Sequence, residues 1–348
     1  GLDQESVAGH ITSNRQGASL GVHTFTWVRA DHVTNPQAQI DCLFAFFENN
    51  PEVPEVLIYG MDGLSIRSWF GGEKVPEGQH VPPQFDAVAG LLVARTDRVD
   101  RYMRPYVSAD PPGAGMNDKN YDSIKLWNFF WDARDAYDRQ YEHALEANKD
   151  YDGPVIGPGM PPTDWWRAQL PKLWPTLSNK GPGGFVPNEW FPVRWAKWQL
   201  EEFDQAPRLG GLHRPVSVDL KDAEGRALPR AAQAAALQAG WQRLIEDLPE
   251  GERVVRVFYD GLNQPGVLPL LQQLEDAGAP DPTAIQQGFD LGHRLGNLGM
   301  MAPMVGLSLS SFASTGSGGA SVTANLTADG KLHLMLVTPP ALDTWRPK

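Results

Sequence analysis

Two stretches of the sequence decide the fold: EVLIYGMDG at residues 55–63 and RVVRVFYDG at residues 253–261. Each is rich in β-branched and aromatic residues and ends in Asp-Gly, a pattern typical of a strand that stops at a tight turn. Glycine tolerates the positive φ that such a turn can require. We therefore expect two apolar strands that end at Asp62 and Asp260.

The signals around these two stretches occur in the same order. An apolar run is followed by a helix that begins near a proline, and then by the strand. The ranges are 21–28, 36–47 and 55–60 in the first unit, and 211–220, 229–248 and 253–259 in the second. Because strand-helix-strand units with glycine-rich exits are common, a duplication and a chance match both stay open.

This alternation predicts an α/β fold of two related strand-helix-strand lobes, with helix-covered mixed sheets and a Trp/Pro-rich middle segment. We place the N-terminal lobe, with its Trp-rich helical excursion, at residues 1–205 and the C-terminal lobe at 206–348. Further expected elements are a buried strand at 88–94, helices at 121–149 and 267–277, a mobile loop at 314–319, and a final hairpin of 322–326 with 332–337.

The composition is that of a folded, acidic protein. Of the 348 residues, 41% are hydrophobic and 21% are charged, and the formal net charge is −12. Such a charge repels a phosphate backbone, so nucleic acid is not an expected partner. No run of about 18 apolar residues occurs, so we expect no membrane-spanning helix in this sequence.

The single cysteine, Cys42, cannot form an internal disulfide, which favours the cytoplasm as the compartment. The chain begins at Gly1 rather than at a methionine, so we expect that a targeting or anchoring segment can have preceded it. Cys42 lies in an apolar stretch with a helical pattern. We interpret it as a buried, inert thiol rather than a nucleophile, because reactive thiols need an exposed, electropositive setting.

Motifs that carry chemistry are missing from the sequence. There is no G-x-S-x-G nucleophile elbow, and the nearest string, GLSLS at residues 306–310, is expected to be a strand or a loop. The eight histidines are scattered, and neither a zinc-protease pair nor a phosphate-binding loop occurs. We therefore expect no catalytic residues, no metal and no cofactor.

Asp62 and Asp260 are the best remaining candidates for a site, because ligands of open α/β sheets bind outside the carboxyl ends of the strands. An aspartate that stabilises a turn explains both equally well, and we favour that interpretation. A small acidic run, Glu201, Glu202 and Asp204, is most simply a solvated helix face.

The middle of the chain holds eight of the twelve tryptophans. We expect most of them to pack in the core. Trp165, Trp166 and Arg167 are the exception, since they fall in what we expect to be a proline-bounded loop, and both residue types are enriched at interface hot spots. They are therefore candidate partner-binding residues, together with Asp62 and Asp260.

Three strings resemble the type VI secretion system lipase adaptor family of bacteria: TFTWVR at residues 24–29, LIYGMDG at 57–63 and PPTDWW at 161–166. The resemblance extends from about residue 21 to residue 340. It implies a non-enzymatic adaptor that binds a phospholipase-type toxic effector in the producing cell and helps load it onto the secretion spike protein. It brings no catalytic or ligand residues with it.

Two other classes of function stay open at this point. An unrecognised or degenerate α/β hydrolase would use the same scaffold, and it requires an aspartate beside a histidine and a serine. A structural component of the secretion apparatus would assemble with itself instead of forming a stoichiometric complex with an effector.

Overall fold

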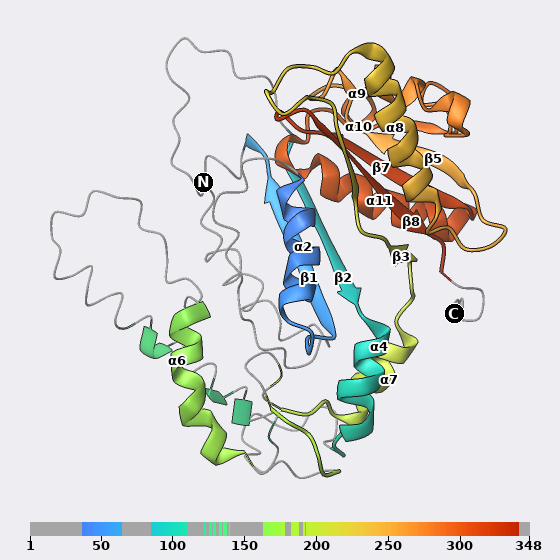
Figure 1. Cartoon of the computed structure of the whole chain (residues 1–348). Helices are drawn as coiled ribbons and strands as arrows, with labels where there is room; N and C mark the ends of the chain where they lie inside the picture. The colour runs from blue at the N-terminus through green and yellow to red at the C-terminus, as the bar shows by residue number, and fades with distance from the viewer. Residues whose placement is uncertain are drawn as a thin grey trace, which may run out of the picture.

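The computed structural model describes residues 37–64, 85–109, selected positions between 122 and 139, 163–177, 182–187, 191 and 193–340. Within these residues the protein is mixed α/β, as predicted, with one six-stranded sheet and one two-stranded sheet (Figure 1). The expected strand at 21–28 lies outside the described residues. The described positions between 122 and 139 are helical, within the predicted range 121–149.

The six-stranded sheet follows the order β3-β8-β7-β5-β6, and β4 pairs with the other half of β8. Parallel pairs join β5 to β6 and to β7, whereas β8 runs antiparallel to β7, β4 and β3. The pair β7–β8 is the predicted hairpin. The strands are β3 (Gly211–Leu212), β4 (Val216–Asp219), β5 (Val254–Tyr259), β6 (Gly288–Asp290), β7 (Ala320–Leu326) and β8 (Lys331–Thr338).

Helices cover both faces of this sheet. On one face α8 (Arg230–Ile245) and α9 (Val267–Gln272) pack on the strands, and Trp241 of α8 is almost fully buried there. A short 3₁₀ turn, η5 (Glu275–Ala277), follows α9. On the other face lies α11 (Ala302–Ser317), preceded by α10 (Leu291–Leu295) and η6 (Gly299–Met301). The sheet is therefore a middle layer, which matches the predicted class.

A two-stranded ribbon and a helix lie on the side of α11 that faces away from the large sheet. The strands β1 (Glu55–Asp62) and β2 (Ala87–Ala94) form an antiparallel ribbon that packs against α11 and η6, and α2 (Ala38–Asn49) packs beside it (Figure 1). One hydrophobic core joins these elements to the large sheet. Its members include Ile40 of α2, Ile58 of β1, Met304 of α11 and Val337 of β8.

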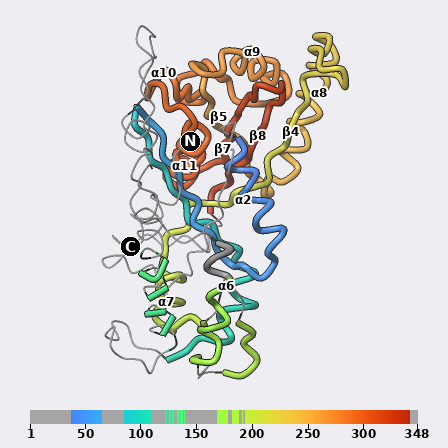
Figure 2. The backbone as a smooth tube through the Cα atoms, turned by 90° about the vertical axis from the view of Figure 1, so that its left-hand side faces the viewer, coloured from blue at the N-terminus to red at the C-terminus, as the bar shows by residue number. Residues whose placement is uncertain are grey.

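A smaller part lies at the end of the molecule away from α9 and α10, as both views show (Figures 1 and 2). It has its own apolar cluster of Val99, Met103, Trp195 and Leu200. Its elements are α4 (Thr96–Arg98), a π-helical turn η2 (Val99–Met103), η3 (Arg104–Tyr106), α6 (Thr163–Leu173), η4 (Trp174–Thr176) and α7 (Lys197–Gln205). The acidic run on α7 is exposed, as expected.

Two predictions about the segment 302–319 are wrong. Residues 306–310 were expected to form a strand or a loop, and residues 314–319 a mobile loop. Instead, α11 includes all of 306–310 and continues to Ser317. The small residues of α11 let the helix lie close to its neighbours: a Cβ on Gly306 would come within 3.1 Å of Leu291 Cδ1. Serine hydroxyls donate to carbonyl oxygens inside the helix, for example Ser308 to Met304 at 2.9 Å, so they can be accommodated without other partners.

The interpretation of Cys42 as a buried thiol is also wrong, because this side chain is exposed. The core-facing positions of α2 are Ile40, Leu43 and Phe47, three and four residues apart, and Cys42 lies outside that stripe. The apolar content of the stretch predicted the helix correctly but not which of its side chains face the core.

The two units predicted to be related differ in how their last strand pairs. In the first unit β1 is antiparallel to β2, whereas in the second β5 is parallel to both of its neighbours. The glycines after them also differ: Gly63 has a φ of 150°, whereas Gly261 does not have a positive φ. At Gly261 the requirement is space, since a Cβ there would lie 2.2 Å from Asp290 Oδ2.

Candidate functional site

The carboxyl ends of β5 and β6 form a topological switch point. These strands are parallel neighbours, but the chain leaves β5 toward α9 on one face of the sheet and leaves β6 toward α10 and α11 on the other. Ligand sites of open α/β sheets form at such positions. Asp260 directly follows β5 and Asp290 ends β6, so both carboxylates belong to this edge.

Asp260 is 2% exposed, and its carboxylate accepts hydrogen bonds from residues of its own turn. Its Oδ1 accepts hydrogen bonds from the backbone N–H groups of Leu262 at 3.2 Å and Asn263 at 3.1 Å. Its Oδ2 accepts from Asn263 Nδ2 at 2.7 Å. This carboxylate stabilises the turn after β5, which is the interpretation that the sequence favoured.

Asp290 is hydrogen-bonded to an exposed histidine. Its Oδ2 lies 2.7 Å from His293 Nδ1, and its Oδ1 accepts from the backbone N–H groups of His293 at 3.2 Å and Gly261 at 3.1 Å. Asp290 is therefore the N-cap of α10 and also fixes the turn after β5. The sequence patterns considered above did not indicate this pair.

Asp62 is 3% exposed and also has structural bonds. Its Oδ1 accepts from Gly63 N at 2.9 Å and its Oδ2 from Met300 N at 2.8 Å. A Cβ on Gly292 would lie 2.5 Å from Asp260 Oδ1, so both aspartates reach the segment that runs from β6 through α10 to η6. The structure thus brings the two predicted residues to one connecting segment, where Asp62 holds the backbone at Met300 and Asp260 lies against Gly292.

These groups do not form a catalytic arrangement within the described part of the chain. His293 has a carboxylate partner in Asp290, but no serine or cysteine of the described residues is bonded to it. No cluster of three metal-ligating side chains occurs among those residues either. What the edge does offer is a rigid backbone with polar side chains at its surface.

Exposed apolar side chains surround α10. Leu262, Leu295 and Ile285 are 49%, 45% and 78% exposed, and Phe85 is 57% exposed. Leu262 lies against Gly292, Phe85 lies against Gly296, and the carbonyl of Ile285 accepts from Arg294 Nη2 at 2.9 Å. We call these four residues the α10 surface. Such gatherings of apolar side chains often mark interaction sites.

A second apolar area is the outer face of the β1–β2 ribbon. Leu57 and Leu92 are register partners on this face, with Val88 on the same side, and they are 43%, 49% and 57% exposed. The predicted strand at 88–94 is therefore correct, but it is not buried throughout. Only its other face, with Ala87 and Ala89, joins the core.

The prediction that Trp165, Trp166 and Arg167 lie in a loop is wrong. Their backbone belongs to α6, which runs from Thr163 to Leu173. The side chains of Trp165, Trp166 and Arg167 lie outside the described residues, so their role as partner-binding residues stays a prediction. Among the other tryptophans of the middle segment, Trp195 is buried as expected, and Trp174 and Trp198 are half-buried.

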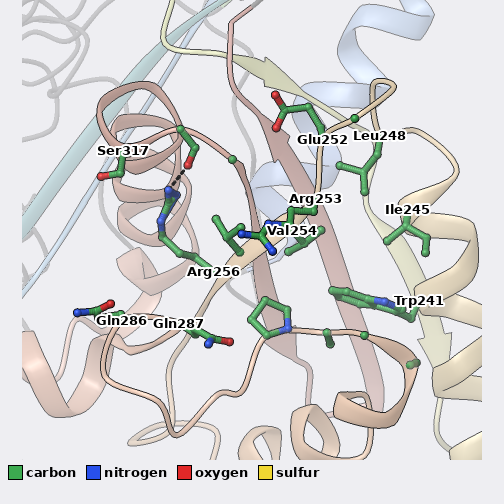
Figure 3. A pocket seen from close by; sticks show the side chains of 18 residues that line it. Trp241, Ile245, Leu248, Glu252, Arg253, Val254, Arg256, Gln286, Gln287 and Ser317 are labelled. Carbon is green, nitrogen blue, oxygen red and sulfur yellow. Dashed lines mark hydrogen bonds between the residues drawn. The ribbon is translucent and has the colours of Figure 1, made fainter.

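An open depression of about 1050 Å³ lies at the opposite, amino end of β5 (Figure 3). Trp241, Ile245 and Leu248 line one side of it, and Gln286 and Gln287 lie toward another. It has no counterpart among the motifs of the sequence, because its walls come from four separate segments.

Arg256 connects this depression to the end of α11. It is 7% exposed, and its guanidinium donates to the carbonyls of Ala313 and Gly318. Figure 3 shows this side chain at the depression. Burial lowers the pKa of this guanidinium. A cation at this position satisfies carbonyls that the helix C-terminus leaves free, so Arg256 is a helix cap rather than a ligand group.

The fold and these surfaces define an α/β protein that exposes apolar side chains in two areas and, in its described part, holds Asp62 and Asp260 in structural bonds. Two family models match the chain: Type VI lipase adapter protein Tla3, N-terminal, at residues 2–80, and Type VI lipase adapter protein Tla3, C-terminal, at residues 209–339. Together they match more than half of its length. The chain therefore belongs to the type VI lipase adapter protein Tla3 family.

This membership confirms the resemblance in the sequence. The C-terminal match begins close to the predicted boundary after residue 205, although that boundary itself stays a prediction. No solved structure matches the chain. In the described part, no helix has both the length and the apolar character that crossing a bilayer requires.

Proposed function

We propose that this protein is a non-enzymatic adaptor that binds a phospholipase-type toxic effector and helps load it onto the spike of the type VI secretion system. Membership of the lipase adapter family carries this proposal. The structural roles of Asp62 and Asp260 support it, since neither carboxylate is free to act on a substrate. Binding takes place in the cytoplasm of the producing cell, before secretion.

The effector docks on the α10 surface in this proposal. Its four apolar side chains lie on short, well-anchored segments, so little conformational freedom is lost when a partner covers them. A stable complex of two folded proteins buries on the order of 1,600 Å² in total, with apolar anchors near the centre and a polar rim. His293 and Arg294 supply polar groups beside the anchors.

The test is co-elution of the full chain with a type VI lipase effector from the same organism. We expect a stoichiometric complex in size-exclusion chromatography at micromolar concentration, and at least tenfold weaker binding for the double variant Leu262→Asp with Leu295→Asp. The matched variant Leu57→Asp places a charge on the β1–β2 ribbon instead. If only Leu57→Asp weakens binding, the docking surface is misplaced, and if the wild-type chain does not bind, the adaptor proposal itself fails.

The Asp290–His293 pair favours one rival, a hydrolase. The isolated chain is assayed with ester and phospholipid substrates. We expect the wild-type chain and the variant His293→Ala to give the same background rate. A loss of turnover in that variant would support the rival. A structural component of the secretion apparatus would instead grow into large assemblies of the chain alone, which light scattering detects.

A further inference from the structure

A buried arginine with unpaired donors lies in the small part of the molecule that contains α7. Arg194 is 8% exposed, and its Nε and Nη1 atoms are fully buried and have no hydrogen-bond partner among the described residues. Ser108 is 7% exposed, and its hydroxyl is also buried with no partner among these residues. These are three of the five side-chain atoms with this property in the described part of the chain.

The backbone brings these two residues together. Ser108 forms a parallel bridge with Ala196: Ser108 N donates to Trp195 O and Lys197 N donates to Ser108 O, both at 2.8 Å. Trp195 packs into the apolar cluster of this part of the molecule. Since alternate residues of an extended segment point to opposite sides, Arg194 and Ser108 lie on the same side of the bridge, away from that cluster.

Other arginines of this chain have hydrogen-bond acceptors for their guanidinium groups. Arg256 donates to backbone carbonyls, and Arg104 nearby forms a bidentate pair with Asp204 at 2.7 and 2.8 Å. Within the described part of the chain, Arg194 lies over the face of Phe185, with its guanidinium carbon 5.6 Å from the ring centroid. That contact is favourable for a cation but accepts no N–H group. A buried charge without a partner is costly and calls for an explanation in a native structure.

We propose that Arg194 and Ser108 form a binding site for an oxyanion, that is, a carboxylate or phosphate group. A guanidinium supplies only donors, and a hydroxyl adds one more. Arginine binds carboxylates and phosphates through short, charge-assisted hydrogen bonds. The Phe185 ring forms an apolar wall beside the guanidinium, which strengthens these bonds by excluding water.

Two sources can supply this oxyanion. One is a free anion in solution, and it does not depend on the proposed function. The other is an acidic side chain or the C-terminal carboxylate of the bound effector, and this source rests on the proposed adaptor role. The experiment therefore has one arm for each source.

In the first arm the full chain is titrated with inorganic phosphate and, separately, acetate at constant ionic strength, and the melting temperature is followed. We expect a saturable increase for the wild-type chain, none for Arg194→Gln, and about tenfold weaker apparent affinity for Ser108→Ala, which loses one hydrogen bond to the anion. The control is Arg101→Gln, which removes the same charge at an exposed position of η2 and should respond as the wild type does.

In the second arm the affinity of the same variants for the lipase effector is measured by calorimetry. A decrease of tenfold or more for Arg194→Gln and a smaller one for Ser108→Ala, with Arg101→Gln unchanged, identifies the effector as the source. If neither arm separates the Arg194 and Ser108 variants from Arg101→Gln, the oxyanion site is refuted. Binding of the wild-type chain to the effector would still stand in that case, so the two proposals fail separately. Should Arg194→Gln not fold, Ser108→Ala alone decides.

Discussion

Replacing Asp260 by alanine should destabilise the fold, because the carboxylate stabilises the turn after β5. The carboxylate is 2% exposed and accepts three hydrogen bonds, from Leu262 N, Asn263 N and Asn263 Nδ2. A hydrogen bond to a charged group contributes about 1.5–3 kcal/mol, but water can reach part of the turn once the side chain is removed. We therefore expect Asp260→Ala to lower the free energy of unfolding by about 3–5 kcal/mol.

Urea unfolding, followed by tryptophan fluorescence, measures this loss, because Trp241 is buried in the core on the α8 face of the sheet. Asp260→Asn retains one acceptor but turns an amide toward Asn263 Nδ2, so about 1–2 kcal/mol should be lost. Asp276→Ala, at an exposed position after α9, serves as the control and should stay within about 0.5 kcal/mol of the wild type. An Asp260→Ala variant as stable as this control would refute the structural role of the carboxylate.

Three further predictions concern charge and packing. Burial raises the pKa of Glu55 to about 7, so the folded state favours its neutral form, and its contribution to stability is lost as the pH rises from about 4.5 to 7. In chemical denaturation, the free energy of unfolding of Glu55→Gln should equal that of the wild type at pH 4.5. At pH 8 it should be higher by up to about 3 kcal/mol, and by less if water reaches the carboxylate. Equal free energies of unfolding at pH 8 would contradict this. Burial lowers the pKa of His333, whose Nδ1 lies 2.9 Å from Ser217 Oγ, so its contribution is present above the ordinary pKa and lost as the pH falls through the lowered value. The melting temperature of His333→Gln should accordingly fall less between pH 7.5 and pH 5 than that of the wild type, and an equal fall would argue against this role. A Cβ at Gly240 of α8 would lie 2.3 Å from Val218 Cγ2 of β4. Gly240→Ala should therefore lower the free energy of unfolding in urea by about 1–3 kcal/mol, although alanine has the better helix propensity. A stabilised variant would mean that α8 can move away from β4 without loss of stability.

The elements that sequence patterns predicted well are those whose signal is local. The strands β1 and β5, the helix α8 after Pro229, and the β7–β8 hairpin all carry strong apolar runs or clear boundary residues. The helix α11 was missed because its serine and glycine content is typical of loops. Its burial between the large sheet and the β1–β2 ribbon overrides that intrinsic preference.

The site was predicted only in part for the same reason. Asp62 and Asp260 could be placed at strand ends because Asp-Gly follows an apolar run in each case. Asp290 ends a strand of only three residues, too short for a pattern, although its position three residues before His293 is an N-cap spacing that could have indicated the start of α10. Arg194 and Ser108 are 86 positions apart in the sequence, and no local signal joins them.

The shared core bears on how the chain can act as an adaptor. Residues of α2 and β1, within the N-terminal family match, pack in one hydrophobic cluster with α11 and β8 of the C-terminal match. Arg98 reinforces the N-terminal part by donating to the carbonyls of Phe47, Asn50 and Val53 at the end of α2. Because the two matched parts bury each other's apolar surface, both of them contribute to the core that supports α10 and its exposed side chains. A partner that docks there meets a preorganised surface, which lowers the entropic cost of forming the complex.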